Sequence, residues 1–350
     1  MDKKELHYAS LDEQISKLKS HYLIIQNEER AKKVLEAIGY SNLIKSYREP
    51  YIISTETGKM YRSDVTFEQI YSLYLSSKNL RNAVMASMLD LEERIKESAA
   101  DVIARSFGIH QDDYLAFRNY QNKRKRKQRF SLSGILTTMK DTLDTDKNPI
   151  HHYTVQYGFV PPWILFKSVY LSTIINFIDL MKKPQQTLMV KKLYPDNASH
   201  SPEVMINLMM DTLFTCLEYR NIAAHGGRIY NYRSNRRVRF SSEIPFSMEG
   251  FSQLLQILNF MKYTAPYEHL QNVLTHELNR HCSNYPQDVT YLGQILNVNI
   301  FKREIVWVTD KTNKYHINQH CSGMQNAKQI DLTEAIKQGF IQCKRCCQTY

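Results

Sequence analysis

The sequence predicts a mainly helical protein with a small β/α module at its C-terminus. Apolar residues recur at helical spacing in long stretches between residues 11 and 282. The chain has only 11 glycines and 10 prolines among 350 residues, so few positions interrupt helices. Four of the six cysteines fall in the last 30 residues, which marks the tail as a separate module. A chain of this length can form one large core and a small module.

Helical signals follow one another along most of the chain. Leu11, Ile15 and Leu18 share one helical face, and Gly39 suits the C-cap of a second helix. Pro162 favours a helix start, because the N–H that proline lacks is unpaired there in any case. The expected helices are a pair over 11–39, then 67–106, 131–144, 163–182, 202–224 and a helical stretch over 247–282, with a loop or short hairpin at 50–65.

The composition changes near residues 284–286, where we place a boundary. Two short strands are expected beyond it, one around Tyr291 to Val298 and one at 305–308. A short helix is expected at 330–337. The chain therefore divides into a helical domain of residues 1–287 and a module of residues 288–350.

The formal net charge of +11 indicates either a solvated basic surface or a polyanionic partner. Charge alone favours nucleic acid only modestly, because anionic membranes attract the same surface. The sequence contains no secretory signal and no apolar stretch of about 18 residues, which predicts a cytoplasmic protein without membrane insertion. In a reducing compartment the six cysteines are poor candidates for disulfides, and Cys216 and Cys282 are expected in the core.

Arg220, Asn221 and His225 carry the most informative chemistry. Arginine offers a charged planar fork to phosphate oxygens, and histidine transfers protons near neutral pH. Asn221 adds an uncharged donor. On an ideal helix, residues five apart diverge by about 140°, so a shared site needs the helix to end at His225 or a second copy of the chain. The structural alternatives are a surface ion pair of Arg220 with Glu218 and a C-cap role for His225.

Two basic segments are candidates for phosphate contacts. The first is 123–127, with Lys125 and Arg126 at its centre, and a solvated loop is an equal alternative. The second follows His225 and interleaves arginines with tyrosines, a pattern suited to unpaired RNA bases, although a charged loop with buried tyrosines is also possible. Its candidate residues are Arg228, Tyr230, Arg233, Arg236 and Arg237.

Several blocks in the same order resemble the Abi-like family of bacterial abortive-infection proteins, of the AbiD/AbiF type. They include 11–15, 66–70, 91–96 and the helix at Trp163. The last block is Arg220-Asn221-x-x-Ala224-His225, followed by Arg228-Ile229-Tyr230-Asn231. The Arg220 to His225 spacing also resembles the R-x4-6-H signature of HEPN ribonucleases.

The resemblance implies an all-α HEPN bundle with a helical N-terminal extension. It implies a metal-independent endoribonuclease that acts in phage defence or as the toxin of a toxin–antitoxin pair, with Arg220, Asn221 and His225 as catalytic residues. Arg228 and Asn231 would support the RNA site. Many relatives carry a second histidine where this chain has Gly226. The expected partners are RNA, a second copy of the chain, and an RNA or protein antitoxin; the alternative is an inactive RNA- or protein-binding HEPN module.

The tail contains His316-x4-Cys321 and Cys343-x2-Cys346. These ligand types and spacings suit one tetrahedral structural Zn²⁺, which would stabilise a module with little core of its own. His320 and Cys347 are possible substitutes, and free thiols are the alternative. The pattern also resembles small Cys/His modules of assorted bacterial proteins. No cofactor is expected for catalysis.

Overall fold

The computed structural model describes residues 7–56, 58–195, 200–234, 250–301, 305–316, 318–319, 321 and 324–347. The chain forms two compact units, Met1–Val298 and Asn299–Tyr350. The first is built almost entirely from helices and the second contains a small sheet, so the predicted mainly helical class is confirmed. Among the described residues, no helix combines the length and the apolar character that crossing a membrane requires.

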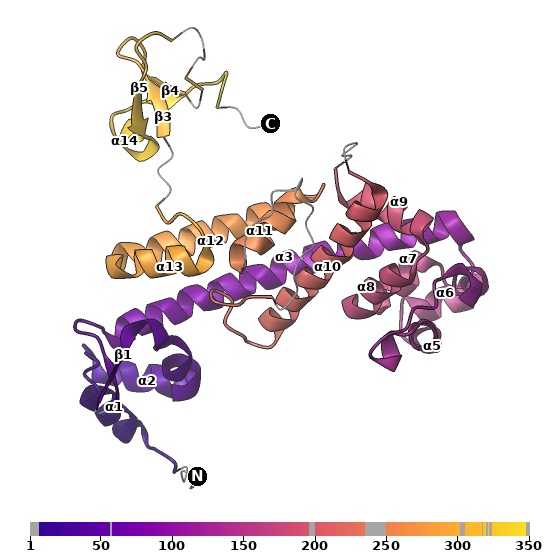
Figure 1. The fold of residues 1–350 in the computed structure, drawn as a ribbon, viewed down its shortest axis with the longest axis horizontal. Coiled ribbons are helices and arrows are strands. Elements are labelled where there is room, and N and C mark those ends of the chain that lie inside the picture. Colours follow the sequence, from indigo (N-terminus) through magenta and orange to yellow (C-terminus); the bar gives the residue numbers. More distant parts are fainter. Residues whose placement is uncertain are drawn as a thin grey trace. The chain divides into compact units, whose positions relative to one another are not determined.

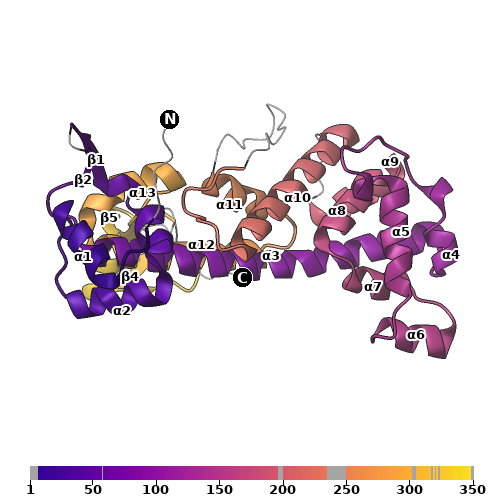
Figure 2. The same cartoon turned by 90° about the horizontal axis from the view of Figure 1, so that it is seen from below.

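Helix α3 (Phe67–Phe107) is the axis of the first unit. The Thr66 side chain caps its first turn by accepting from the Gln69 N–H, and Gly108 ends it at a φ of 86°. Ile70, Val84 and Ile95 are fully buried along its length. Helices α9 (Lys183–Leu193), α10 (Pro202–Ala224) and α12 (Ala265–Asn284) pack along α3 (Figures 1 and 2).

Helices α1 (Leu11–Ser20) and α2 (Glu28–Ile38) form the expected pair near the start of α3. A capping box at Ser10 begins α1, and Gly39 ends α2 at a φ of 88°. Strands β1 (Ile52–Thr55) and β2 (Gly58–Tyr61) pair antiparallel, which confirms the short hairpin. Two short irregular helices, Ser41–Lys45 and Glu49–Tyr51, join these elements.

The predicted single helix at 163–182 is wrong. Helix α7 (Pro162–Leu165) and a 3-10 turn at Phe166–Ser168 come first, and α8 (Leu171–Leu180) follows. Val169 and Tyr170 between them have extended backbone, which suits the β-branched and aromatic side chains. Figure 2 shows these elements together with α4 (Gln111–Tyr114), α5 (Leu132–Leu143) and α6 (Ile150–Tyr157) near the far end of α3.

The helical stretch predicted at 247–282 consists of α11 (Phe251–Phe260) and α12. Pro266 lies in the first turn of α12, where its missing N–H breaks no helical bond but prevents a continuous helix. The strand predicted around Tyr291–Val298 is wrong, because this segment forms α13 (Val289–Leu296) with Leu292 and Leu296 buried on one face. The first unit therefore extends to Val298, beyond the boundary expected at 287.

A buried polar network holds the start of α13. Asp288 accepts hydrogen bonds from the Tyr51 hydroxyl at 2.7 Å and from the Gln69 side-chain amide at 3.0 Å. The imidazole of His281, which is fully buried, contacts Asp288 at 2.8 Å and the Ser72 hydroxyl at 2.9 Å. The network joins α3, α12 and the segment before β1 to the turn that leads into α13.

The second unit contains a four-stranded sheet in the order β5–β3–β4–β6. Strand β3 (Ile305–Val308) pairs antiparallel with β4 (Lys314–His316) and β5 (Lys328–Asp331), and β6 (Ile341–Gln342) pairs parallel with β4. Helix α14 (Leu332–Lys337) packs against the sheet. The hydrophobic core of this second unit is small: Val306, Val308 and Ala335 are buried, with a few half-buried side chains around them.

Candidate active site and metal centre

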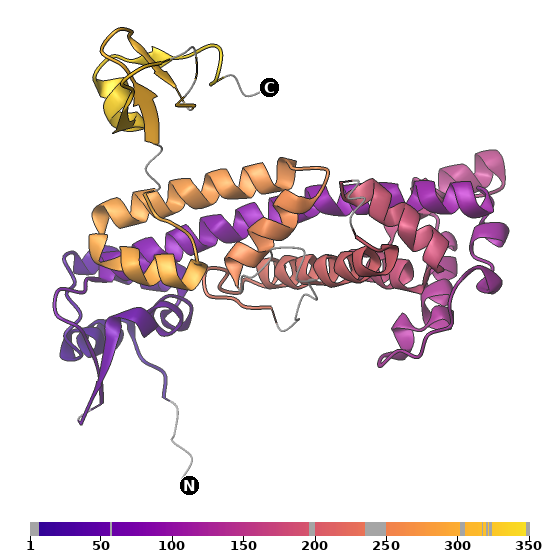
Figure 3. The same ribbon diagram turned by 45° about the horizontal axis from the view of Figure 1, so that its top comes forward.

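Helix α10 positions the Arg220 motif and lies alongside α3 (Figure 3). Ser201 caps its first turn by accepting from the Val204 N–H. Leu213, Cys216 and Tyr219 face the core and are at most 1% exposed. Arg220 directly follows the buried Tyr219 and so points to a neighbouring face of the helix. There its side chain is half-buried.

Helix α10 ends at His225, which is its C-cap and is exposed. The N–H of Gly226 donates to the Ala223 carbonyl and the N–H of Gly227 donates to the Ile222 carbonyl. With Gly226 at a φ of 73°, these bonds form a Schellman motif. The Arg81 guanidinium on α3 donates to the Gly226 carbonyl at 3.1 Å, which ties this helix end to the axis of the unit.

Arg220 and Asn221 line a cleft of about 870 Å³ between α10, α8 and the segment 121–130. The Nε of Arg220 is buried and has no hydrogen-bond partner among the described residues. A buried donor without an acceptor is energetically costly, and an anionic ligand would satisfy it. His225 does not line this cleft. One chain therefore presents Arg220 and His225 to different surroundings.

Cations outnumber acids in the lining of the cleft. Lys123 and Lys125 both pair with Asp179, so part of this charge is neutralised within the protein. Arg126, Lys127 and Arg129 are exposed and have no acidic partner among the described residues. The lining cations are Lys123, Lys125, Arg126, Lys127, Arg129, Lys183 and Arg220, and the lining acids are Asp179, Glu203 and Asp211. The structure thus brings Lys125 and Arg126 to the same cleft as Arg220 and Asn221.

The segment after His225 is largely structural where it is described. Arg228 donates to the Ser46 carbonyl and lies 3.8 Å from the Glu49 carboxylate. Tyr230 is 2% exposed and stacks on Tyr47, and burial raises its pKa. A ring in that position supports the core and is not available to an RNA base. Asn231 is half-buried and Arg233 is exposed, whereas Arg236 and Arg237 lie outside the described residues.

Sequence reasoning did not identify several side chains of the cleft. Tyr170 is 80% exposed at its edge, although the sequence placed this residue inside a helix. Lys183 comes from α9, and Arg129 lies two residues beyond the basic run. In the sequence, only the basic run 123–127 indicated this side of the cleft, because residue spacing does not reveal which distant helices pack together.

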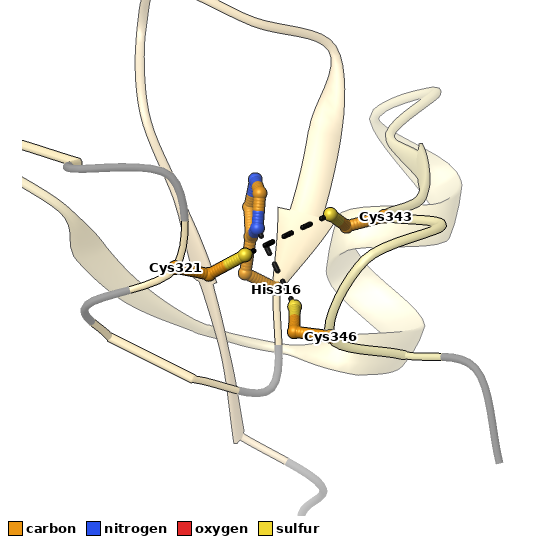
Figure 4. Close-up of side chains that lie close together, drawn as sticks. All are labelled: His316, Cys321, Cys343 and Cys346. Carbon is orange, nitrogen blue, oxygen red and sulfur yellow. Dashed lines mark hydrogen bonds between the residues drawn. The ribbon is translucent and has the colours of Figure 1, made fainter.

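In the second unit, His316, Cys321, Cys343 and Cys346 converge (Figure 4). Their ligand atoms all lie within 4.8 Å of one another. The Cys321 and Cys343 sulfurs are 4.0 Å apart, and the Cys346 sulfur is 3.5 Å from His316 Nδ1. His316 comes from β4, and the loop after β6 supplies the Cys343 and Cys346 pair. The four predicted ligands therefore form one group that could hold a metal ion.

The donor set fits zinc. A tetrahedron with zinc–sulfur distances of about 2.3 Å has sulfurs roughly 3.8 Å apart, close to the separation of Cys321 and Cys343. Burial lowers the pKa of His316, with Lys314 nearby, which favours the neutral imidazole that binds metals. Burial raises the pKa of Cys343, but hydrogen bonds from the Arg345 and Cys346 backbone and from the Cys346 and Cys321 side chains together lower it overall. Lower thiol pKa favours the thiolate ligand.

Cys347, one of the two alternative ligands, lies close to the group without belonging to it. Its sulfur is 3.7 Å from that of Cys346 and donates to the Tyr315 carbonyl at 3.6 Å. The contact with a carbonyl indicates a thiol rather than a ligand thiolate. The other alternative, His320, lies outside the described residues.

The family model of the Abi-like proteins matches residues 33–231, more than half of the chain. The matched region ends at Asn231 and includes Arg220, Asn221 and His225, together with the cleft segment 121–130. No curated protein and no solved structure matches the chain significantly.

Proposed function

The chain belongs to the Abi-like protein family, and on that premise we propose that it is a metal-independent endoribonuclease of abortive infection. It would act on the RNA of an infected cell, or as the toxin of a toxin–antitoxin pair with an RNA or protein antitoxin. The observation that carries the proposal is the buried Nε of Arg220, which has no acceptor within the described chain and lines a cleft rich in cations. A phosphodiester supplies the missing acceptor.

The proposed reaction is an internal transesterification. The 2′-oxygen of the RNA forms a bond to phosphorus as its proton passes to a base, and the bond from phosphorus to the 5′-oxygen breaks as that oxygen receives a proton. Arg220 stabilises the charge on the phosphorane, and Asn221 at the cleft wall donates to the same phosphate. His225 carries out proton transfer. The products are a 2′,3′-cyclic phosphate and a 5′-hydroxyl.

A homodimer brings the required groups together in this proposal. His225 is exposed at the end of α10 and lies outside the cleft that holds Arg220 of the same chain. Two copies related by a two-fold axis would place His225 of each chain beside the Arg220 cleft of the other. In this arrangement the His225 imidazole of one chain would accept the proton of the 2′-oxygen at the cleft of the other chain and then return a proton to the 5′-oxygen.

The proposal is tested by RNA cleavage with Arg220→Ala and His225→Ala variants. Each should reduce cleavage by at least about 100-fold, because a charged contact or a proton-transfer group is lost. Matched controls are Arg94→Ala on α3 and His269→Ala on α12, both exposed and outside the cleft. Thermal unfolding should show that all four proteins are folded. Undiminished cleavage by either motif variant would contradict the assignment.

The second candidate function is RNA or protein binding without catalysis. The observation in its favour is that His225 does not line the Arg220 cleft within one chain. Wild-type protein that binds RNA but leaves it intact, as a dimer and under conditions that stabilise its fold, would support this reading. Products with 3′-hydroxyl ends would instead indicate a different reaction.

For the second unit we propose a structural zinc ion held by His316, Cys321, Cys343 and Cys346. When bound, the ion would cross-link the loops around a small core, and four protein ligands would leave no open position for substrate. Purified protein should contain about one zinc per chain. The Cys343→Ser/Cys346→Ser variant should lose it, whereas the control Cys282→Ser should keep it. Full zinc content in the double variant would overturn the ligand assignment.

A further inference from the structure

The cleft beside Arg220 has an aromatic edge as well as a basic lining, and the two features together indicate what kind of RNA it receives. We infer that it binds single-stranded RNA and that the Tyr170 ring is a stacking platform for an unpaired base at its edge. This inference rests on the proposed function, because it names the substrate class of the same site. It assigns a role to Tyr170, Arg129 and Lys127, which lie outside the catalytic motif.

Tyr170 is placed for such a role by the interruption between α7 and α8. The extended backbone at Val169 and Tyr170 turns one side chain inward and the next outward. Val169 is 3% exposed and anchors the turn in the core, whereas Tyr170 is 80% exposed. Among the described residues, no ring contact or hydrogen bond holds the Tyr170 side chain. A large aromatic ring that is open to solvent can stack on an unpaired base.

The charges of the cleft suit a phosphate backbone. Arg126, Lys127 and Arg129 are exposed and unpaired with acids among the described residues, and Arg129 lies 4.7 Å above the Phe130 ring. Asp179, one of the three acids of the lining, is already engaged by Lys123 and Lys125. Its negative charge is thus compensated, and the exposed cations remain available to phosphates.

The dimensions of the site distinguish a single strand from a duplex. A volume of about 870 Å³ lies within the range of pockets that enclose a small ligand, so it suits a few unpaired nucleotides. Domains that recognise double-stranded RNA instead spread their contacts over about 16 base pairs of its regular surface. Within a duplex, moreover, the bases are stacked on one another and cannot reach the Tyr170 ring.

The experiment measures binding in a chain that does not cleave. The probe is a fluorescently labelled oligoribonucleotide of about ten nucleotides without secondary structure, titrated with dimeric full-length His225→Ala protein. In this background Tyr170→Ala should weaken binding about 5-fold or more, the effect of losing one stacked base. Tyr170→Phe should retain the affinity, because it keeps the ring. Tyr8→Ala, which removes a tyrosine that is 93% exposed elsewhere, is the matched control and should bind normally.

Three results would overturn the inference: unchanged affinity in Tyr170→Ala, a loss in Tyr170→Phe as large as in Tyr170→Ala, or equal affinity for the same sequence as a duplex. The outcome is separable from that of the proposed function. Wild-type protein that binds single strands through Tyr170 but never cleaves them would refute the nuclease and leave this inference standing. Conversely, if the wild type cleaves RNA while the Tyr170→Ala chain binds it normally, the inference is refuted and the proposed nuclease stands.

Discussion

Gly226 determines how helix α10 ends. Its φ of 73° is the conformation that the C′ position of a Schellman motif requires, and a Cβ at this position would meet no atom of the described residues within 4 Å. Any residue other than glycine is therefore disfavoured here by the backbone conformation, and not by a clash of its side chain with neighbouring atoms. At position 226 this chain has glycine, the residue that best completes the helix stop. In the proposed reaction, proton transfer at this helix end is therefore assigned to His225.

Cys216 gives a residue-scale prediction about pH. Complete burial raises the pKa of its thiol to about 12, from an ordinary value of 9. The folded state therefore favours the neutral thiol, and the stability from this group is complete below pH 9 and lost as the pH rises towards 12. The wild type should lose about 1.4 kcal/mol of unfolding free energy per pH unit above pH 9 through this residue.

Urea unfolding of wild type and Cys216→Ala between pH 8 and pH 10.5 measures this effect. The variant lacks the thiol, so its unfolding free energy should decline less steeply with pH. Tyrosines titrate in the same range, but they are common to both proteins and cancel in the comparison. Parallel pH profiles for the two proteins would contradict the burial of this thiol.

At the scale of elements, α13 shows how a helix is fixed by the turn that precedes it. Asp288 accepts from Tyr51 and Gln69 and contacts His281, and all four side chains are buried. Removing one charged partner leaves the others unpaired in the interior, which typically costs about 3–5 kcal/mol. We therefore expect Asp288→Ala to destabilise the first unit by an amount in that range, measured by urea unfolding.

The control for this prediction is Asp12→Ala, which removes a largely exposed carboxylate that pairs with Lys32 on the same unit. It should change stability little, because solvent screens exposed ion pairs. If the two variants unfold at the same urea concentration, the Asp288 network contributes far less than its burial indicates.

Helix ends that are set by residues at the end itself could be predicted from the sequence. Elements whose structure depends on contacts with distant parts of the chain could not. Thr66 and Gly108 delimit α3 through their own side chains and backbone, so the sequence located both ends closely. The break at Tyr170 and the helix at Val289–Leu296 depend on what the chain packs against. The grouping of the four candidate metal ligands was predictable because ligand type and spacing follow from coordination chemistry. The wall of the cleft was not predictable from the sequence, since α8, α9 and α10 are brought together there only by the tertiary fold.

On the scale of the whole molecule, the two units suggest a division of labour. The cleft, the Arg220 motif and α10 all lie within the first unit, and the candidate metal ligands all lie within the second. We predict that a chain ending at Val298 folds, forms a homodimer and retains RNA cleavage within about 10-fold of the full chain, because no group of the proposed reaction is removed.

Sedimentation and cleavage of the shortened chain test this prediction. The shortened His225→Ala chain is the inactive reference, and Arg220→Ala subunits mixed with His225→Ala subunits report on sites shared between chains. A well-folded but inert shortened chain would place the second unit within the catalytic or substrate-binding machinery. A fully active monomer would exclude the shared site.

Helix α3 has a further consequence for how the first unit unfolds. Its 41 residues extend over about 60 Å at 1.5 Å per residue, and elements from both the start and the later parts of the unit pack on it. If the elements packed on one end of α3 unfold, that end loses its apolar contacts. The elements at the other end pack on the same helix and are therefore destabilised as well. Heat should therefore unfold this unit in one cooperative calorimetric transition. A protease that opens one end would destabilise the other, so the cell could inactivate the protein with a single cut.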